Sequence, residues 1–223
     1  MMELKISNIS KKHGKDKILD NISINLKEGI YGLVGVNGAG KTTLLQIISN
    51  NLKADSGKII LENETIKRTY NIGYLPQSFK GFSSFSVLEF MKYIVLLRGS
   101  SVKNSYDDIN EVLKLVNLEN KKKCKIKKLS GGMLRRLGIA QAILKYPPII
   151  LLDEPTVGLD PIERESFKLL LEKISKKSII ILSTHILEDI ENIASNILLL
   201  KDGKLTRLKT NKKIGNEIIN KYR

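Results

Sequence analysis

The sequence is poor in the residues that build disulfides and metal cages. Its 223 residues include one cysteine, Cys124, and two histidines, His13 and His185. A single cysteine excludes an intramolecular disulfide and a cysteine metal cage. Two histidines leave little room for a histidine metal site.

Long apolar runs are also absent. The most apolar stretches, such as residues 94–97 and 179–182, are short, whereas a membrane-spanning helix needs about 20 apolar residues. Glu3 and Lys5 stand beside the starting methionines, and no apolar signal-peptide core follows them. We therefore expect a soluble, intracellular chain; if it works at a membrane, other subunits must supply the spanning helices.

Positive charge is what the chain has in excess. Lysine and arginine number 38 against 23 aspartates and glutamates, which gives a formal net charge of +15. This balance suggests a polyanionic neighbour: nucleic acid, an anionic membrane face or a phosphate ligand. A lysine-rich genomic composition explains the same excess equally well, so the charge alone does not choose a partner.

Hydrophobic periodicity divides the chain into two strand-rich parts and a helical middle. The first part predicts strands at residues 4–9, 18–26, 30–34, 58–61 and 72–75 and a helix at 41–50. The middle predicts helices at 86–97, 106–116 and 132–145. The last part predicts strands at 149–152, 178–182, 197–200 and 204–208 and helices at 161–176 and 186–193. We predict a single α/β domain over residues 1–223, with a helical subdomain inserted at about residues 83–147.

Two of the strand patterns carry further detail. Ile18, Ile22, Ile24 and Leu26 fall mostly on one face at a period of two, which is typical of a strand with one buried face. Residues 149–152 and 178–182 are continuous apolar runs, which are typical of strands buried on both faces of a sheet.

A glycine-rich loop stands between a predicted strand and a predicted helix. Residues 35–42 read Gly-Val-Asn-Gly-Ala-Gly-Lys-Thr and match G-x-x-x-x-G-K-[ST]. The glycines let backbone N–H groups turn toward an anion, and the helix N-terminus adds its dipole. In such loops the lysine reaches the β- and γ-phosphates and the threonine hydroxyl ligates Mg²⁺. The predicted nucleotide-binding residues are Gly35, Asn37, Gly38, Ala39, Gly40, Lys41, Thr42 and Thr43.

An acidic pair ends the predicted strand at residues 149–152. Asp153 is placed to hold the Mg²⁺ shell, and Glu154 to orient or deprotonate a water that attacks the γ-phosphate. By itself an Asp-Glu pair is often only a surface turn. The phosphate loop upstream favours the catalytic interpretation.

The segment Leu129-Ser130-Gly131-Gly132-Met133 closely resembles the signature motif of the ATP-binding cassette (ABC) ATPases, with Met133 where the commonest form has glutamine. It opens a basic helix that carries Arg135 and Arg136. Gln77 stands where this family has its Q-loop, residues 158–160 resemble its D-loop, and residues 183–185 resemble its H-loop. Six motifs occur in the family's order. Met133 and residues 138–141 and 186–189 are most similar to the separately encoded ATPase subunits of bacterial drug, bacitracin and lantibiotic exporters.

The resemblance implies a P-loop NTPase with the ABC ATPase fold: a mixed sheet core, an N-terminal antiparallel β part and the inserted helical subdomain. It implies that two copies close head-to-tail on ATP, between the phosphate loop of one and the signature of the other. The residues that it places across this interface are Ser130, Gly131, Gly132, Met133 and, in the D-loop, Asp160.

The resemblance also implies the chemistry, which uses ATP and Mg²⁺. The implied catalytic residues are Lys41, Gln77, Glu154 and His185, and the implied metal ligands are Thr42, Gln77 and Asp153. His185 would contact the γ-phosphate and help hold Glu154. By itself, a histidine after an apolar strand is more often a satisfied core residue.

The partners implied are a second copy of the chain and separately encoded permease subunits, with the protein peripheral on the cytoplasmic face of the membrane. Non-transport cassette ATPases that act on DNA or ribosomes are the alternative. The DNA-repair type inserts long coiled coils and the translation type carries two cassettes in one chain; this sequence shows neither. We therefore expect no nucleic acid partner.

Three features leave their roles open. His13 stands where the family usually has an aromatic residue that stacks on adenine, so it either stacks weakly or is a surface turn residue. The lysines between residues 121 and 128 form a solvated face, a contact with anionic lipid or a nucleic acid contact. Phe90 has the spacing of a core residue, whereas Phe79, Phe82 and Phe85 either fold back onto the helices or line a groove for a short helix of the membrane subunit.

Overall fold

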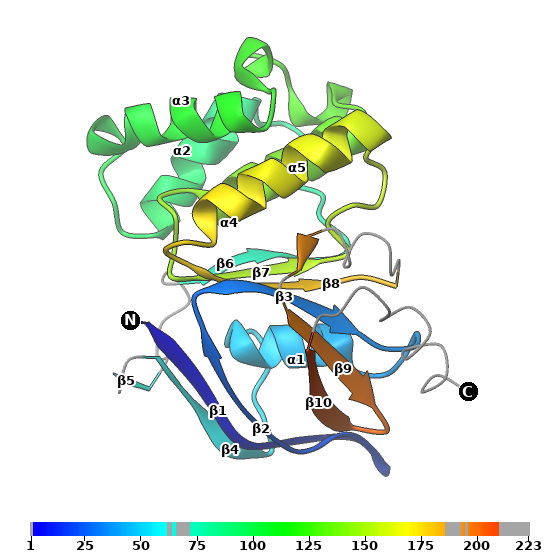
Figure 1. Ribbon diagram of the computed structural model, residues 1–223. Helices are drawn as coiled ribbons and strands as arrows, with labels where there is room; N and C mark the ends of the chain where they lie inside the picture. Colours follow the sequence, from blue (N-terminus) through cyan, green and yellow to red (C-terminus); the bar gives the residue numbers. More distant parts are fainter. Residues whose placement is uncertain (1, 62–63, 66–71, 186–192, 195, 210–223) are drawn as a thin grey trace.

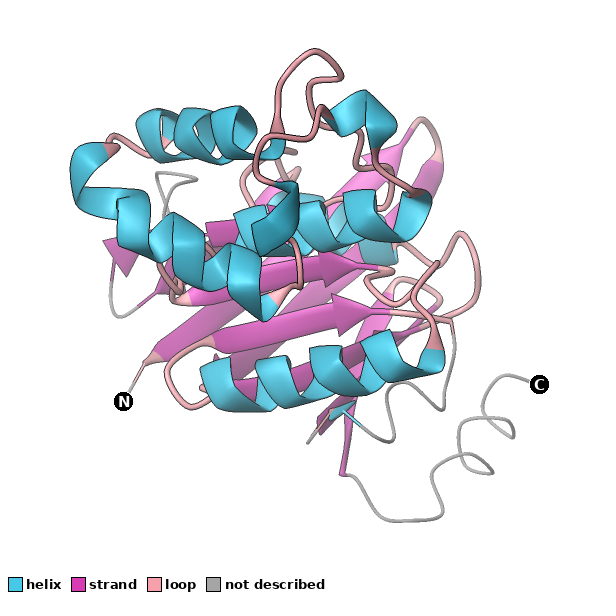
Figure 2. Cartoon of the chain, turned by 90° about the horizontal axis from the view of Figure 1, so that it is seen from above, coloured by secondary structure: helices cyan, strands magenta, loops and turns pink. Residues whose placement is uncertain are grey.

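Two β-sheets and a layer of helices make up the fold. The computed structural model describes residues 2–61, 64–65, 72–185, 193–194 and 196–209. Figure 1 shows helix α1 (Lys41–Ile48) between the two sheets. On the other face of the central sheet lie α2 (Val87–Leu97), α3 (Tyr106–Leu115), α4 (Gly131–Ile143) and α5 (Pro161–Ile174). Figure 2 shows these helices lying over the strands when the molecule is seen from above.

The central sheet has six strands in the order β10-β9-β3-β8-β7-β6. They are β3 (Gly29–Val34), β6 (Ile72–Leu75), β7 (Ile149–Asp153), β8 (Ile179–Ser183), β9 (Asn196–Lys201) and β10 (Lys204–Lys209). Neighbours from β9 to β6 are parallel, and β10 pairs antiparallel with β9. The sheet is therefore mixed, as predicted. Every residue of β7 and β8 is buried, which confirms that the two apolar runs are strands covered on both faces.

The second sheet is antiparallel, in the order β2-β1-β4-β5. Its strands are β1 (Glu3–His13), β2 (Asp16–Lys27), β4 (Ser56–Leu61) and β5 (Glu64–Thr65). Ile22 and Leu26 are buried in one core and Ile24 packs partly against it, as predicted, but at the start of the strand Leu19 is fully buried and Ile18 only partly so. Asn21 takes a left-handed φ of 53°, and the register between β1 and β2 shifts at this point. Such a bulge reverses the alternation of the strand.

The carboxyl ends of the parallel strands meet at one edge of the central sheet. The glycine-rich loop follows β3, and Gln77 comes two residues after β6. Asp153 and Ser183 are the last residues of β7 and β8 and lie opposite one another in the register. Ligands of parallel α/β sheets bind at this edge, and here it collects segments that lie far apart in the sequence.

Helix α4 approaches β6 closely because glycines stand at the contact. A Cβ on Gly73 would collide with the carbonyl of Ala142, and a Cβ on Gly138 would lie 2.6 Å from Cδ1 of Leu75. The close approach brings the side chains of α4 within reach of the loops that follow β6 and β7.

The predicted elements are present within the described residues, with ends shifted by a few positions. The helix predicted to end at residue 145 ends at Ile143, because Leu144 leaves the helical region and Lys145 has a φ of 61°. Strand β5 was not predicted. The helix predicted at residues 186–193 lies, except for its last residue, outside the described part, as does the motif at 186–189. No helix in the described part of the chain is both long and apolar enough to cross a bilayer.

Candidate nucleotide site

One cavity of about 440 Å³ at the carboxyl edge of the central sheet brings most of the predicted site residues together. It is lined by His13, Ile18, Asn37, Gly38, Gly40, Lys41, Thr42, Thr43, Gln77, Asp153, Glu154 and His185. Ile18 is the member of this set that was not predicted. Gly35 and Ala39 belong to the same loop but face elsewhere: the Gly35 carbonyl accepts a hydrogen bond from Lys41, and Ala39 lines a neighbouring pocket.

The loop at residues 35–40 owes its shape to two glycines with positive φ. Gly38 has a φ of 83°, and Gly40 has a φ of 98° immediately before α1. Both angles strain any other residue. The loop therefore turns directly into the first turn of α1, whose N–H groups and dipole favour an anion.

Lys41 is the buried cation of the cavity. Its Nζ donates to the carbonyls of Gly35 at 2.7 Å and Val36 at 3.2 Å. Burial lowers the pKa of Lys41, and the charges of Asp153 and Glu154 oppose that shift. The ammonium group thus lies over the loop, where phosphates would meet it.

Thr42 and Asp153 supply adjacent oxygen ligands from two distant segments. The Thr42 hydroxyl donates to Oδ2 of Asp153 at 2.8 Å, and the Ser183 hydroxyl donates to Oδ1 of the same carboxylate. Asp153 is 1% exposed, so these partners hold it in one orientation. A hydroxyl and a carboxylate are the hard oxygen ligands that Mg²⁺ prefers, so the donor set fits the predicted metal.

Glu154 is held in a backbone conformation that its residue type disfavours. Its φ is 53°, which belongs to the left-handed region. Its N–H donates to the carbonyl of Ser183 at 3.1 Å and lies 3.2 Å from the Ser183 hydroxyl. Its Oε2 lies 2.9 Å from Nδ1 of His185. Strained backbones of this kind occur at functional sites, where the surrounding contacts hold them.

The signature and D-loop residues lie outside this cavity. Ser130 caps the N-terminus of α4 and accepts a hydrogen bond from the Met133 N–H at 3.2 Å. Asp160 caps α5 and accepts from the Glu163 N–H at 2.8 Å. None of the predicted residues Ser130, Gly131, Gly132, Met133 and Asp160 is among the residues that line the cavity. Within one copy, the structure does not bring them to the phosphate loop.

His13 lines the cavity from the end of β1 and is solvent-exposed. Gly14 follows it with a φ of 60° and turns the chain toward β2. Stacking on adenine stays a prediction.

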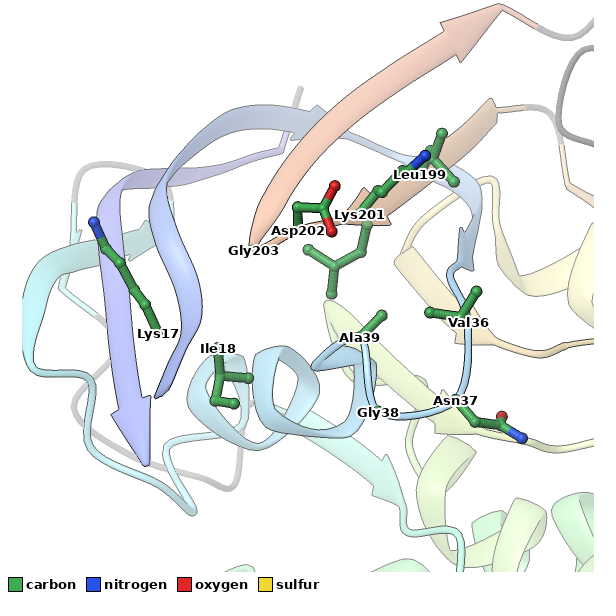
Figure 3. Close-up of a pocket in the computed structure, with 11 residues that line it drawn as sticks. Lys17, Ile18, Val36, Asn37, Gly38, Ala39, Leu199, Lys201, Asp202 and Gly203 are labelled. Carbon is green, nitrogen blue, oxygen red and sulfur yellow. The ribbon is translucent and has the colours of Figure 1, made fainter. Parts of the chain in front are cut away.

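A neighbouring pocket of about 520 Å³ flanks the other side of the phosphate loop (Figure 3). It shares Ile18, Asn37 and Gly38 with the first cavity and extends toward Lys201 and Gly203 of the β9–β10 hairpin. Lys41, Asp153 and Glu154 line only the 440 Å³ cavity, so the chemistry belongs there.

The four phenylalanines of residues 79–90 divide between the core and the surface. Phe90 is 3% exposed, which confirms its prediction as a core residue, and Phe79 and Phe85 pack partly against the same core. Phe82 is 47% exposed. Its ring lies 5.3 Å from those of Phe85 and Tyr93, measured between centroids.

Besides Ile18, sequence reasoning missed Arg135, which the pattern showed only as part of a basic helix. It is 7% exposed and donates hydrogen bonds to backbone carbonyls at the ends of β6 and β7. Its position five residues after the signature serine was the available signal, but nothing in the pattern shows that the side chain turns inward.

The fold and the cavity define a phosphate-loop ATPase. The model of the ABC transporter family matches residues 19–157. The bacitracin transport ATP-binding protein BcrA of Bacillus licheniformis is 35% identical over 213 residues, which cover 91% of this chain and 68% of the relative. The lantibiotic transport ATP-binding protein SrtF of Streptococcus pyogenes is 35% identical over 206 residues, covering 91% and 88%. The chain belongs to the ABC transporter family.

Solved structures agree with this assignment. A dimeric post-hydrolysis state of the ATP-binding cassette MJ0796, bound to ADP and Pi, is 28% identical with a TM-score of 0.84 and covers 93% of this chain and 99% of that one. An ATP-binding subunit of an ABC transporter has a TM-score of 0.85 at 22% identity, covering 99% and 94%. The predicted family, fold class and ATPase activity are confirmed.

Proposed function

We propose that the chain is the ATP-hydrolysing subunit of an ABC exporter. It binds MgATP in the cavity at the carboxyl edge of the central sheet and drives separately encoded membrane subunits. The observation that carries the proposal is the convergence of Lys41, the Thr42–Asp153 pair and the Glu154–His185 pair in one cavity.

Each side chain has a task that its contacts support. Lys41 binds the β- and γ-phosphates, and Thr42 and Asp153 hold Mg²⁺, which when bound offsets negative charge on the phosphates. Gln77 lines the same cavity and is a further oxygen ligand. Glu154 orients the attacking water and accepts its proton, while His185 holds the carboxylate and contacts the γ-phosphate.

A second copy of the chain completes the site. The signature residues begin α4, whose N-terminus suits a phosphate, yet none of them lines the cavity of their own copy. Gly131 and Gly132 have no side chains there, and a Cβ on Gly131 would meet nothing within 4 Å. This open helix end supports a head-to-tail dimer in which the signature of one copy closes over the ATP of the other, with Asp160 beside it.

The membrane subunit contacts the surface around Phe82. An exposed aromatic ring backed by two further rings suits an interface anchor. The lysine segment runs beside it, because the Lys127 N–H donates to Ser83 and the Leu88 N–H donates to Lys122. A short permease helix that carries acidic residues fits this combination. In this arrangement residues 83–147 act as the helical subdomain that relays the state of the nucleotide.

The direction of transport is inferred from relatives. A bacitracin transport, a lantibiotic transport and a linearmycin resistance ATP-binding protein, at 32–35% identity, favour export, although a methionine import ATP-binding protein is 33% identical. Through its permease, the chain acts on the cytoplasmic face of the membrane. DNA or ribosome action has no specific observation in its favour.

Replacement of Phe82 tests the permease contact. Phe82→Ala is expected to leave ATP binding of the isolated subunit intact and to reduce co-purification with membrane subunits. Leu97→Ala is the control, since Leu97 is 61% exposed on α2. Equal co-purification of both variants with the permease would contradict the contact. Identification of the co-purified membrane protein, followed by transport assays in vesicles, tests export.

A further inference from the structure

The guanidinium of Arg135 bonds a set of backbone carbonyls, three of which belong to residues of the candidate site. Arg135 is 7% exposed and lies in α4. Its five acceptors are the carbonyl oxygens of Pro76 at 3.0 Å, Gln77 at 3.1 Å, Asp153, Glu154 and Pro155 at 3.5 Å. One side chain thus joins the signature helix to the ends of both β6 and β7.

Arginine suits this position because its planar fork carries five N–H donors in a fixed geometry. A lysine ammonium has three donors on a single atom and cannot span two strand ends in the same way. The acceptors are carbonyls, so the carboxylate of Asp153 remains available to Thr42 and that of Glu154 to His185. The guanidinium thus bonds the backbone carbonyls of the acidic pair and occupies neither carboxylate.

The contact bears on the least favourable backbone position of the site. Glu154 has a φ of 53°; its N–H donates to the carbonyl of Ser183, and its carbonyl accepts from the Arg135 guanidinium. The same guanidinium bonds the carbonyl of Gln77, the second residue of the loop that runs on to Phe79 and Phe82. A displacement of α4 would therefore reach Glu154 and Gln77 through one side chain.

We propose that Arg135 is a positioning residue for ATP hydrolysis. It holds the backbone of Glu154 so that the carboxylate points at the attacking water. Because Arg135 lies in α4, the orientation of Glu154 depends on the position of the signature helix. The proposal rests on the role of Glu154 given above.

Arg98 is a matched control. It is half-buried at the end of α2 and donates to the carbonyls of Leu144 at 2.6 Å and Gln141 at 2.9 Å. It therefore also joins a helix to backbone carbonyls in the helical layer, but neither Arg98 nor these two partners are among the residues that line the cavity. Arg98→Ala therefore measures how much stability and activity are lost when such a structural arginine is removed away from the cavity.

The test compares Arg135→Ala, Arg135→Lys and Arg98→Ala in the full chain by melting temperature, ATP affinity and steady-state hydrolysis. Because small misplacements of a catalytic group have large kinetic effects, Arg135→Ala should lower kcat by about 100-fold, with ATP affinity changed by less than about threefold. Millimolar guanidinium should restore part of the kcat of Arg135→Ala, and Arg135→Lys should be intermediate. Arg98→Ala should lower the melting temperature and keep kcat within about twofold.

Several results would overturn the proposal: an unchanged kcat in folded Arg135→Ala, a loss confined to ATP affinity, an equal kcat loss in Arg98→Ala, or unfolding of every Arg135 variant. Glu154→Gln separates this proposal from the proposed function. If Glu154→Gln hydrolyses ATP normally, the assigned base is wrong. If it is inactive and Arg135→Ala is normal, only the positioning role fails.

Discussion

The nucleotide cavity and the signature segment differ in how many of their functional groups find partners within one copy of the chain. In the nucleotide cavity, Lys41, Thr42 and Glu154 each have hydrogen-bond partners in the same copy. At the signature, the Ser130 hydroxyl accepts its capping bond from the Met133 N–H, Gly131 is exposed and Gly132 is half-buried. The loop end is built to bind nucleotide alone, whereas the signature end requires a surface from outside the copy. Some mutations should therefore abolish hydrolysis or dimer formation while ATP binding by the single copy is retained.

Glu154→Gln should produce the largest effect, a loss of ATP hydrolysis with ATP binding retained. The amide keeps the shape and leaves Asp153 intact but cannot accept a proton, so turnover should fall by about 1,000-fold. ATP should still bind, and an ATP-dependent dimer should be visible by size-exclusion chromatography. Glu172→Gln on the exposed face of α5 is the control. Near-normal hydrolysis by Glu154→Gln would remove the proposed base.

Lys41→Ala should act on ATP binding, the step before hydrolysis. It removes the buried cation from the phosphates, so ATP affinity should fall by about 100-fold or more, since charge-assisted contacts to phosphate are strong. Equilibrium binding of a fluorescent ATP analogue measures this, with Lys58→Ala on β4 as the control. Retained affinity would show that the loop backbone alone supplies the binding.

Ser130→Ala addresses the other end of the machinery. Combined with Glu154→Gln, it should abolish the ATP-dependent dimer without weakening ATP binding by the single copy. The lost helix cap destabilises the fold by about 1 kcal/mol. Ser86→Ala removes the equivalent cap of α2, where Ser86 accepts from Glu89 at 3.2 Å, and should leave the dimer intact. Dimers of equal stability in both variants would mean that Ser130 does not face ATP.

His13 should give the smallest effect. Base stacking is worth about 1–3 kcal/mol at most, and the phosphate loop supplies most of the remaining affinity. His13→Tyr should tighten ATP binding and His13→Ala should weaken it modestly, as measured by titration calorimetry. GTP should also be accepted. An unchanged affinity in His13→Ala would show that adenine does not stack there.

Local sequence patterns predicted most of the fold. β7 and β8 are continuous apolar runs, and the phosphate loop carries its own glycine spacing, so both were accessible without any tertiary information. The face of β2 at Ile18 was not, because the bulge at Asn21 depends on pairing with β1. Strand β5 has two residues and no periodicity to detect.

The candidate site was predictable where a side chain acts near its own motif. Asp153 and Glu154 end a strand, and Thr42 follows the glycine loop, so their meeting follows from the parallel topology. Arg135 was not predictable, because its partners are backbone carbonyls that carry no side-chain signal. Its inward direction depends on the close packing of α4 on β6 at Gly73.

Lys41 already donates to two carbonyls of its own loop, and this has a consequence for ligand discrimination. The side chain is ordered in advance, so little rotamer entropy is lost when phosphate arrives. A ligand gains from the ammonium only if it replaces the two carbonyls with something more strongly negative. AMP, whose single phosphate lies nearest the ribose, offers no such exchange. AMP and adenosine, which carry no β- or γ-phosphate, should therefore be poor competitors of ATP.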